Sequence, residues 1–203
     1  MASPSDIAAI YALSAGALTC CLVMLLHLLE PEFDPSWRML SEYSLGRYGV
    51  LMRLAFLAWG TSVIAVAAAL SGWAWPWSLG LVVVAVGPLG AAFVDTDPIT
   101  TPGSEMSRRS KVHAVLGLLF ILGFPPASTV TGISAAGGLA LGQTLAWASL
   151  IPWLALLWFL AASIRYAPAD GRVGPQVRVG WPNRMLLGAY VAWVALAAAL
   201  VLR

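Results

Sequence analysis

The stretch IAAIYALSAGALTCCLVMLLHLL, from Ile7 to Leu29, decides the fold class of this protein because it contains no Asp, Glu, Lys or Arg. A helix that crosses a bilayer needs about 20 mostly apolar residues. Five similar stretches follow it, at residues 49–70, 75–94, 112–133, 141–164 and 185–202. The stretch at residues 112–133 carries Pro125-Pro126, which predicts a kink or a split at that point. We therefore expect an all-α membrane protein, a six-transmembrane-helix bundle that forms a single domain over residues 1–203.

The composition of the whole chain also indicates a protein that faces lipid. Of its 203 residues, 60% are hydrophobic and 10% are charged, whereas soluble domains carry roughly 25% charged residues. The net charge of +2 and the lack of a basic run with interleaved aromatic residues argue against nucleic acid as a partner. Cys20 and Cys21 are adjacent within the first apolar stretch, which excludes a disulfide framework.

The charged residues gather in three long connections between the predicted helices. Residues 30–47, 95–111 and 165–184 form these long polar connections, while those after the second and fourth helices are short and uncharged. An even number of helices places both termini on the side of the short connections. Every Lys and Arg except Arg203 then lies on or next to the long-loop side. The positive-inside rule therefore predicts a multi-pass protein of the plasma membrane with cytoplasmic long loops and both termini outside.

Polar side chains from different connections share one predicted membrane level. Ionisable residues at membrane depth usually face the interior of the bundle and find partners there. Each also has an ordinary explanation: His27 suits a helix C-terminus, Asp34 suits a helix cap, and Arg53 either extends to the interface or pairs with an acid from another loop. We expect these side chains to converge at the cytoplasmic mouth of the bundle: His27, Asp34, Ser41, Glu42, Tyr43, Arg53, Asp95, Asp97 and His113.

At these residues the sequence resembles the family known as domain of unknown function 998, a group of six-helix prokaryotic integral membrane proteins. The resemblance covers roughly residues 1–135 and implies a six-helix bundle, but no established activity. Its motifs are His27 at the end of the first helix, Ser41-Glu42-Tyr43-Ser44-Leu45-Gly46 leading into Tyr48-Gly49, then Phe93, Asp95, Asp97 and Pro98, and finally His113.

The preferred function is a non-enzymatic membrane protein that binds a lipid headgroup or a small anion. Basic pockets at the cytoplasmic face of a membrane suit anionic lipid headgroups, so membrane lipids are the expected partners. The side chains expected to contact the ligand are Tyr43, Arg53, Arg108, Arg109 and Arg184.

The alternative is a metal-dependent intramembrane hydrolase that acts on a lipid-like substrate. A divalent ion such as zinc takes three protein ligands and a water in catalytic sites, and it lowers the pKa of that water toward about 7. Ser41 or Glu42 would be the nucleophile or base, so whether the protein is an enzyme stays open. Pairing of Arg53 with Asp95 or Glu42 would weaken this hypothesis. The candidate metal ligands are His27, Asp95, Asp97 and His113.

Overall fold

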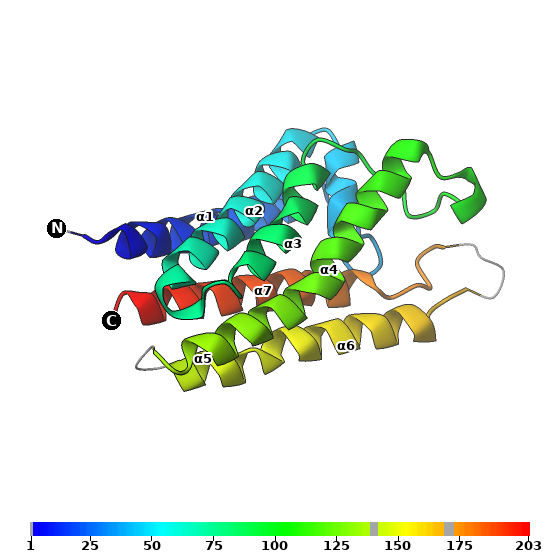
Figure 1. The fold of residues 1–203 in the computed structure, drawn as a ribbon. Helices are drawn as coiled ribbons and strands as arrows, with labels where there is room; N and C mark the ends of the chain where they lie inside the picture. Colours follow the sequence, from blue (N-terminus) through cyan, green and yellow to red (C-terminus); the bar gives the residue numbers. More distant parts are fainter. Residues whose placement is uncertain (1, 139–141, 169–172) are drawn as a thin grey trace.

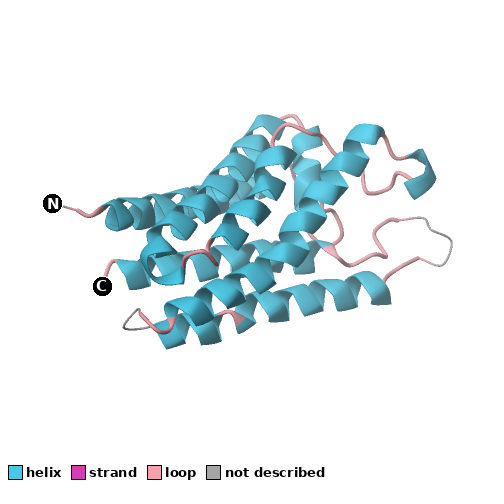
Figure 2. Cartoon of the chain, in the orientation of Figure 1, coloured by secondary structure: helices cyan, strands magenta, loops and turns pink. Residues whose placement is uncertain are grey.

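The computed structural model describes residues 2–138, 142–168 and 173–203. In this part of the chain all regular secondary structure is helical, with no strand (Figure 2). It forms a bundle of α-helices joined by turns and short 3₁₀-helices (Figure 1). The elements are α1 (Pro4–Leu29), η1 (Leu40–Leu45), α2 (Gly49–Ala74), α3 (Leu79–Ala91), η2 (Gly103–Glu105), α4 (Arg108–Ala135), α5 (Gly142–Ala148), α6 (Leu150–Arg165) and α7 (Gly180–Val201).

Among the described residues, five helical segments are long and apolar enough to cross a membrane: α1, α2, α4, the combined α5–α6 segment and α7. The chain is therefore a helical membrane protein. α3 differs from the expectation for residues 75–94, because it has only 13 residues. At 1.5 Å per residue it is about 20 Å long, which is less than the ~30 Å hydrocarbon core of a bilayer.

Prolines explain where several helices begin and end. α2 continues past the predicted end at residue 70 because nothing interrupts it before Pro76, and Trp75 takes the extended backbone (φ −71°, ψ 137°) that a following proline favours. α3 consequently starts later and is shorter. α7 begins at Gly180 rather than at residue 185, with Pro182 in its first turn, where a missing N–H costs nothing. This extension makes Arg184 a helical residue.

Pro125 and Pro126 lie inside α4 but do not split it. Pro125 has no N–H for the carbonyl of Ile121, four residues earlier, and the Tyr190 hydroxyl of α7 donates to that carbonyl instead, at 2.7 Å. Ser128 and Thr129 hydroxyls donate to the Pro125 carbonyl at 2.9 and 2.8 Å. Borrowed hydrogen bonds of this kind keep a proline-containing membrane helix continuous. The fifth predicted helix is interrupted at Ser149 between α5 and α6, and its expected first residue, 141, lies outside the described residues.

Both termini lie at one end of the bundle (Figure 1). The same end holds the α2–α3 turn, while η1, η2 and the described part of the α6–α7 connection lie at the other end, called the loop end below. α1 packs along α2, and α7 packs against α1, α2 and α6. An aromatic core joins α4 to α7, where the rings of Phe124 and Tyr190 stack at 4.4 Å. The fold thus brings η1, the α3–α4 connection and the start of α7 together at the loop end.

Candidate functional site

Arg184, in the first turns of α7, is buried at the loop end with an exposed fraction of 8%. No carboxylate lies within ion-pair distance of it among the described residues. Its guanidinium instead donates to four neutral acceptors: His27 Nε2 at 2.7 Å, the Arg38 carbonyl at 2.7 Å, the Gly180 carbonyl at 3.0 Å and the Tyr43 hydroxyl at 3.3 Å. The arginine therefore joins α7 to the end of α1 and to η1.

The hydrogen bonds of His27 define its protonation. His27 Nδ1 lies 2.7 Å from the carbonyl of Val23, so Nδ1 carries the proton and donates it. Nε2 is then the unprotonated nitrogen, which is the state needed to accept from Arg184. Both ring nitrogens are occupied, so His27 has no nitrogen left for a metal ion.

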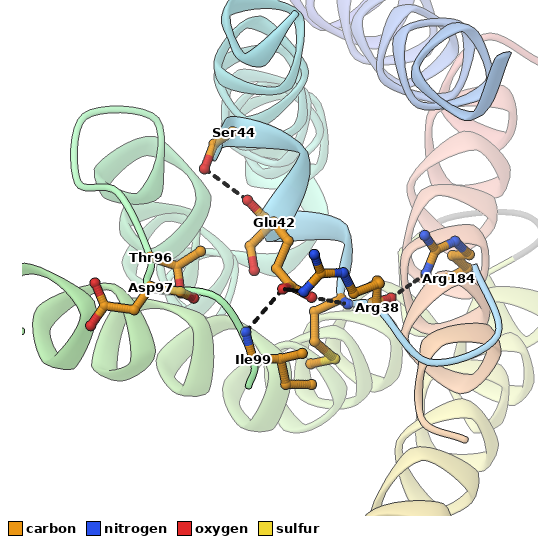
Figure 3. A network of polar contacts seen from close by, with 9 residues as sticks. Arg38, Glu42, Ser44, Thr96, Asp97, Ile99 and Arg184 are labelled. Carbon is orange, nitrogen blue, oxygen red and sulfur yellow. Dashed lines mark hydrogen bonds and ion pairs between the residues drawn. The ribbon is translucent and has the colours of Figure 1, made fainter. Parts of the chain in front are cut away.

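Glu42 is the second buried charge at the loop end, with an exposed fraction of 1%. Its carboxylate accepts from Arg38 Nη1 at 2.7 Å, from the Met39 N–H at 2.8 Å and from the Ile99 N–H at 2.9 Å. The Ile99 contact ties η1 to the α3–α4 connection, and the Arg38 carbonyl continues the chain of contacts to Arg184 (Figure 3). We call this group the arginine network; its members are His27, Arg38, Glu42, Tyr43 and Arg184.

The other predicted ionisable residues stabilise the ends of helices. Arg53 Nη2 pairs with Asp95 Oδ1 at 2.6 Å, and their side chains are 41% and 31% exposed. Asp97 accepts from the N–H and the hydroxyl of Ser107, at 2.7 and 3.0 Å, and Ser107 caps the start of α4. The two aspartates therefore hold α3 and α4 in place, each through its own partners.

Asp34 has a local role in the turn before η1, where the sequence predicted a fresh helix start. The Ser36 N–H donates to Asp34 Oδ1 at 2.8 Å, and this bond holds the pKa of the Asp34 carboxyl below its usual value. The backbone forms turns here, and the 3₁₀-helix begins only at Leu40. Asp34 thus caps a turn rather than a helix.

A cavity of about 430 Å³ lies beside the arginine network, between η1, α2, α3, α4 and α7. This volume falls in the range of small-molecule sites. Ala114 and Leu118 of α4 and Pro98 of the α3–α4 connection line the cavity and are exposed, so the cavity borders the surface both along α4 and at the loop end. Its wall is polar at the loop end, with Ser41, Glu42, Asp97, Ser110, His113 and Asn183, and apolar deeper in the bundle, with Phe56, Trp59, Pro88, Phe120, Leu186 and Tyr190.

Three neutral polar groups in this wall have no hydrogen-bond partner within the described part of the chain. His113 is 7% exposed; its Nδ1 bonds the Val94 carbonyl at 2.6 Å, which leaves Nε2 as a free acceptor. Asn183 Oδ1 accepts from a backbone N–H at 2.9 Å, which leaves its amide N–H groups free. The Ser41 hydroxyl is also unpaired, since Ser41 bonds only through its carbonyl. His113 is buried, and buried polar groups are normally paired; Ser41 and Asn183 are half-buried in the same wall. Together the three free groups form a candidate ligand site.

The residues predicted to contact a ligand have different surroundings in the structure, and most lie away from the cavity wall. Tyr43 and Arg184 belong to the arginine network, and Arg53 pairs with Asp95. Arg108 and Arg109 are exposed at the start of α4. No Lys or Arg among the described residues lines the cavity. Of the candidate catalytic residues, Ser41 and Glu42 do line it.

The four predicted metal ligands do not converge. Across residues 2–138, 142–168 and 173–203, no group of three or more His, Cys, Asp or Glu side chains could hold a metal ion. Arg53 pairs with Asp95 and Arg184 with His27, which is the arrangement expected to weaken the hydrolase hypothesis. His113 is the one member of this predicted set with a free nitrogen facing the cavity wall.

Asn183 and Glu30 are two polar residues of the loop end that sequence reasoning did not single out. Asn183 contributes to the cavity wall. Glu30 is fully buried: its Oε1 accepts from the Tyr48 N–H, and its Oε2 has no partner among the described residues. In the sequence Glu30 marked only the end of the first helix, and Asn183 carries no charge. Only the position of Asn183, one residue before Arg184 at the start of an apolar stretch, hinted at a place inside the bundle.

The fold and the cavity define a helical membrane protein with a mostly apolar site that borders the exposed face of α4. A protein-family model described as "Protein of unknown function (DUF998)" matches residues 13–200, so the chain belongs to this family. The match confirms the resemblance seen in the sequence and extends it over the last two predicted helices. No curated protein and no solved structure matches the chain.

Proposed function

We propose that this protein binds a single membrane lipid in the cavity, with the apolar part of the lipid between α2, α4 and α7 and its headgroup at the loop end. The observation that carries the proposal is an apolar cavity that meets unpaired polar groups at one end and borders the exposed face of α4. A lipid has the matching division between an apolar tail and a polar head. An opening along this face would let it enter from the bilayer.

The lining of the cavity favours a lipid over a small anion. A small anion needs cations or several N–H donors, and the described part of the wall holds no Lys or Arg. Most of the wall is apolar, and apolar wall area favours an apolar ligand. The hydrolase alternative has no matching group of metal ligands and is not carried forward.

The proposed topology has six spans, both termini outside the cell and the long loops in the cytoplasm of a plasma-membrane protein. α3 connects the end of α2 to the start of α4, and the turns on both sides of it are apolar at residues 75–77 and 92–94. These turns extend α3 toward both interfaces. The bias of Lys and Arg toward the long connections supports the orientation.

A pair of glycine substitutions tests the lipid site. Gly117 of α4 lines the cavity, and a Cβ added there meets nothing within 4 Å, so Gly117→Leu is expected to place its side chain in the cavity. Gly188 of α7 is equally open but does not line the cavity, so Gly188→Leu is the matched control. Native mass spectrometry of the full chain, purified in mild detergent, measures the lipid that remains bound. We expect near one lipid per chain for wild type and Gly188→Leu, and much less for Gly117→Leu; equal lipid in all three would overturn the proposal.

A further inference from the structure

We infer that the headgroup bound at Ser41, His113 and Asn183 is uncharged and carries a hydroxyl group, as in a monoacylglycerol or diacylglycerol. The inference rests on the proposed lipid site and names the chemical class of the ligand.

The charges around the cavity disfavour an anionic headgroup. Glu42 and Asp97 both line it, and no cation of the described chain does. The two arginines of the arginine network bond other partners: Arg38 bonds Glu42, and Arg184 bonds the neutral acceptors of the network. A phosphate in the cavity would therefore meet two carboxylates and no guanidinium. An unpaired buried charge of this kind is strongly unfavourable.

A cationic headgroup is disfavoured for a different reason. The carboxylate of Glu42 already accepts three hydrogen bonds, one of them from Arg38. Asp97 already accepts two from Ser107. A bound ammonium would have to break these contacts, which hold η1 and the start of α4 in place. An uncharged headgroup fits without that cost.

The unpaired polar groups specify a hydroxyl. His113 Nε2 is an acceptor, because Nδ1 holds the ring proton, and it needs a donor from the ligand. The Asn183 amide N–H groups are donors and need an acceptor, because Asn183 Oδ1 is fixed by a backbone N–H. A hydroxyl both donates and accepts. The Ser41 hydroxyl can either donate to the ligand or accept from it.

Trp59 marks the deeper, apolar level of the cavity. The indole N–H of Trp59 is buried without an acceptor among the described residues, and Trp59 lines the cavity. It follows Phe56 by one turn of α2, about 4.5 Å along the helix axis, and the Phe56 ring lies 6.0 Å from that of His113. A glycerol ester carries a carbonyl acceptor a few bonds from its free hydroxyl. One glycerolipid therefore spans both levels, with its hydroxyl at His113 and its ester and acyl chain beside the Trp59 ring.

A competition experiment on the full chain in detergent micelles tests the headgroup. Tritiated dioleoylglycerol is bound and then displaced by unlabelled lipids with the same acyl chains: dioleoylglycerol, 1,2-dioleoyl-3-acetylglycerol, whose hydroxyl is blocked, and dioleoylphosphatidylglycerol, which is anionic. Dioleoylglycerol is expected to compete about 3- to 10-fold better than the acetylated lipid, the effect of a lost hydrogen bond or two. The anionic lipid is expected to compete more weakly still.

Serine substitutions check that the contact is made in the cavity. Ser41→Ala removes an unpaired hydroxyl and should weaken dioleoylglycerol binding about 3-fold without changing the melting temperature. Ser163→Ala on α6, whose hydroxyl bonds the Phe159 carbonyl, is the remote control and should leave binding unchanged. His113→Phe is the second variant. It should abolish the preference for dioleoylglycerol over the acetylated lipid.

The outcomes separate this inference from the proposed function. Monooleoylglycerol competing better than dioleoylglycerol would support the same headgroup and assign a single chain to the cavity. If dioleoylphosphatidylglycerol competes as well as dioleoylglycerol and Gly117→Leu blocks both, the hydroxyl inference fails and the lipid site stands. If no lipid competes and Gly117→Leu has no effect, both fail.

Discussion

The arginine network and the cavity wall are neighbours at the loop end, yet they use their polar atoms differently. The arginine network holds two buried charges, on Arg184 and Glu42, and each is surrounded by hydrogen-bond partners. The cavity wall holds neutral groups of Ser41, His113 and Asn183 that lack partners. In this bundle the charged side chains fix the helices, and the neutral ones remain available to a ligand. Substitutions in the arginine network should therefore reduce stability most, and those of exposed charges least.

Arg184→Leu is expected to cost the most stability. It leaves His27 Nε2, the Tyr43 hydroxyl and the Arg38 carbonyl without their donor in a buried place, and each unsatisfied buried group costs about 1–3 kcal/mol. We expect the free energy of unfolding, measured by denaturant titration in micelles, to fall by about 3 kcal/mol or more. Arg184→Lys should recover only part, because an ammonium cannot replace the guanidinium fork. A loss below ~1 kcal/mol would mean that the network is not structural.

Glu42→Gln is expected to cost about 2–3 kcal/mol and to loosen η1 or the α3–α4 connection. The amide cannot accept from all of Arg38, Met39 and Ile99. Hydrogen exchange at the Met39 or the Ile99 amide should therefore become faster, because these two N–H groups bond different oxygens of Glu42 and the amide keeps only one of them. Glu32→Gln is the control, since Glu32 is exposed. Unchanged protection at both Met39 and Ile99 would show that Glu42 does not hold η1 and the α3–α4 connection together.

Tyr190→Phe is expected to cost about 1–2 kcal/mol. It removes the hydroxyl that replaces the missing Pro125 N–H at the Ile121 carbonyl of α4, so the effect should appear as a lower melting temperature. Tyr11→Phe removes an exposed hydroxyl contact to Thr61 and should change stability by less than ~0.5 kcal/mol. Equal effects of the two variants would contradict the proposed role of Tyr190 in keeping α4 continuous.

Breaking the Arg53–Asp95 pair is expected to have the smallest effect. Both side chains are partly exposed, and exposed ion pairs contribute about 0.2–1 kcal/mol. A double-mutant cycle with Arg53→Ala and Asp95→Ala should give a coupling energy in that range, weaker at high salt. Arg108→Ser and Arg109→Ser should change neither stability nor bound lipid. A clear loss of lipid in either of these would restore the anionic-headgroup hypothesis.

Much of the fold follows from the sequence because hydrophobic length is a local property. The long apolar stretches, with Arg53 as their one charged residue, predicted an all-helical membrane protein, and the family assignment is confirmed. The shortness of α3 was not foreseen, because the apolar residues on both sides of it form turns rather than helix. Hydropathy does not distinguish an apolar turn from an apolar helix.

The site was only partly predictable from sequence. Ser41 and His113 were among the candidates and line the cavity, but the roles of the arginines depend on partners distant in the chain, such as His27 for Arg184. Asn183 carries no charge, so a search for ionisable residues passed over it. The cavity itself arises from how α2, α3, α4 and α7 pack, which no local pattern encodes.

The most direct test of the division between the two regions uses the two histidines of the chain, one in each region. Nitrogen NMR of ¹⁵N-histidine-labelled protein in micelles reports each imidazole nitrogen separately. Dioleoylglycerol is expected to shift the Nε2 signal of His113, because this nitrogen gains a hydrogen bond. The His27 signals should not change, because Arg184 already donates to His27 Nε2. A shift at His27 with none at His113 would contradict this division and place the ligand in the arginine network.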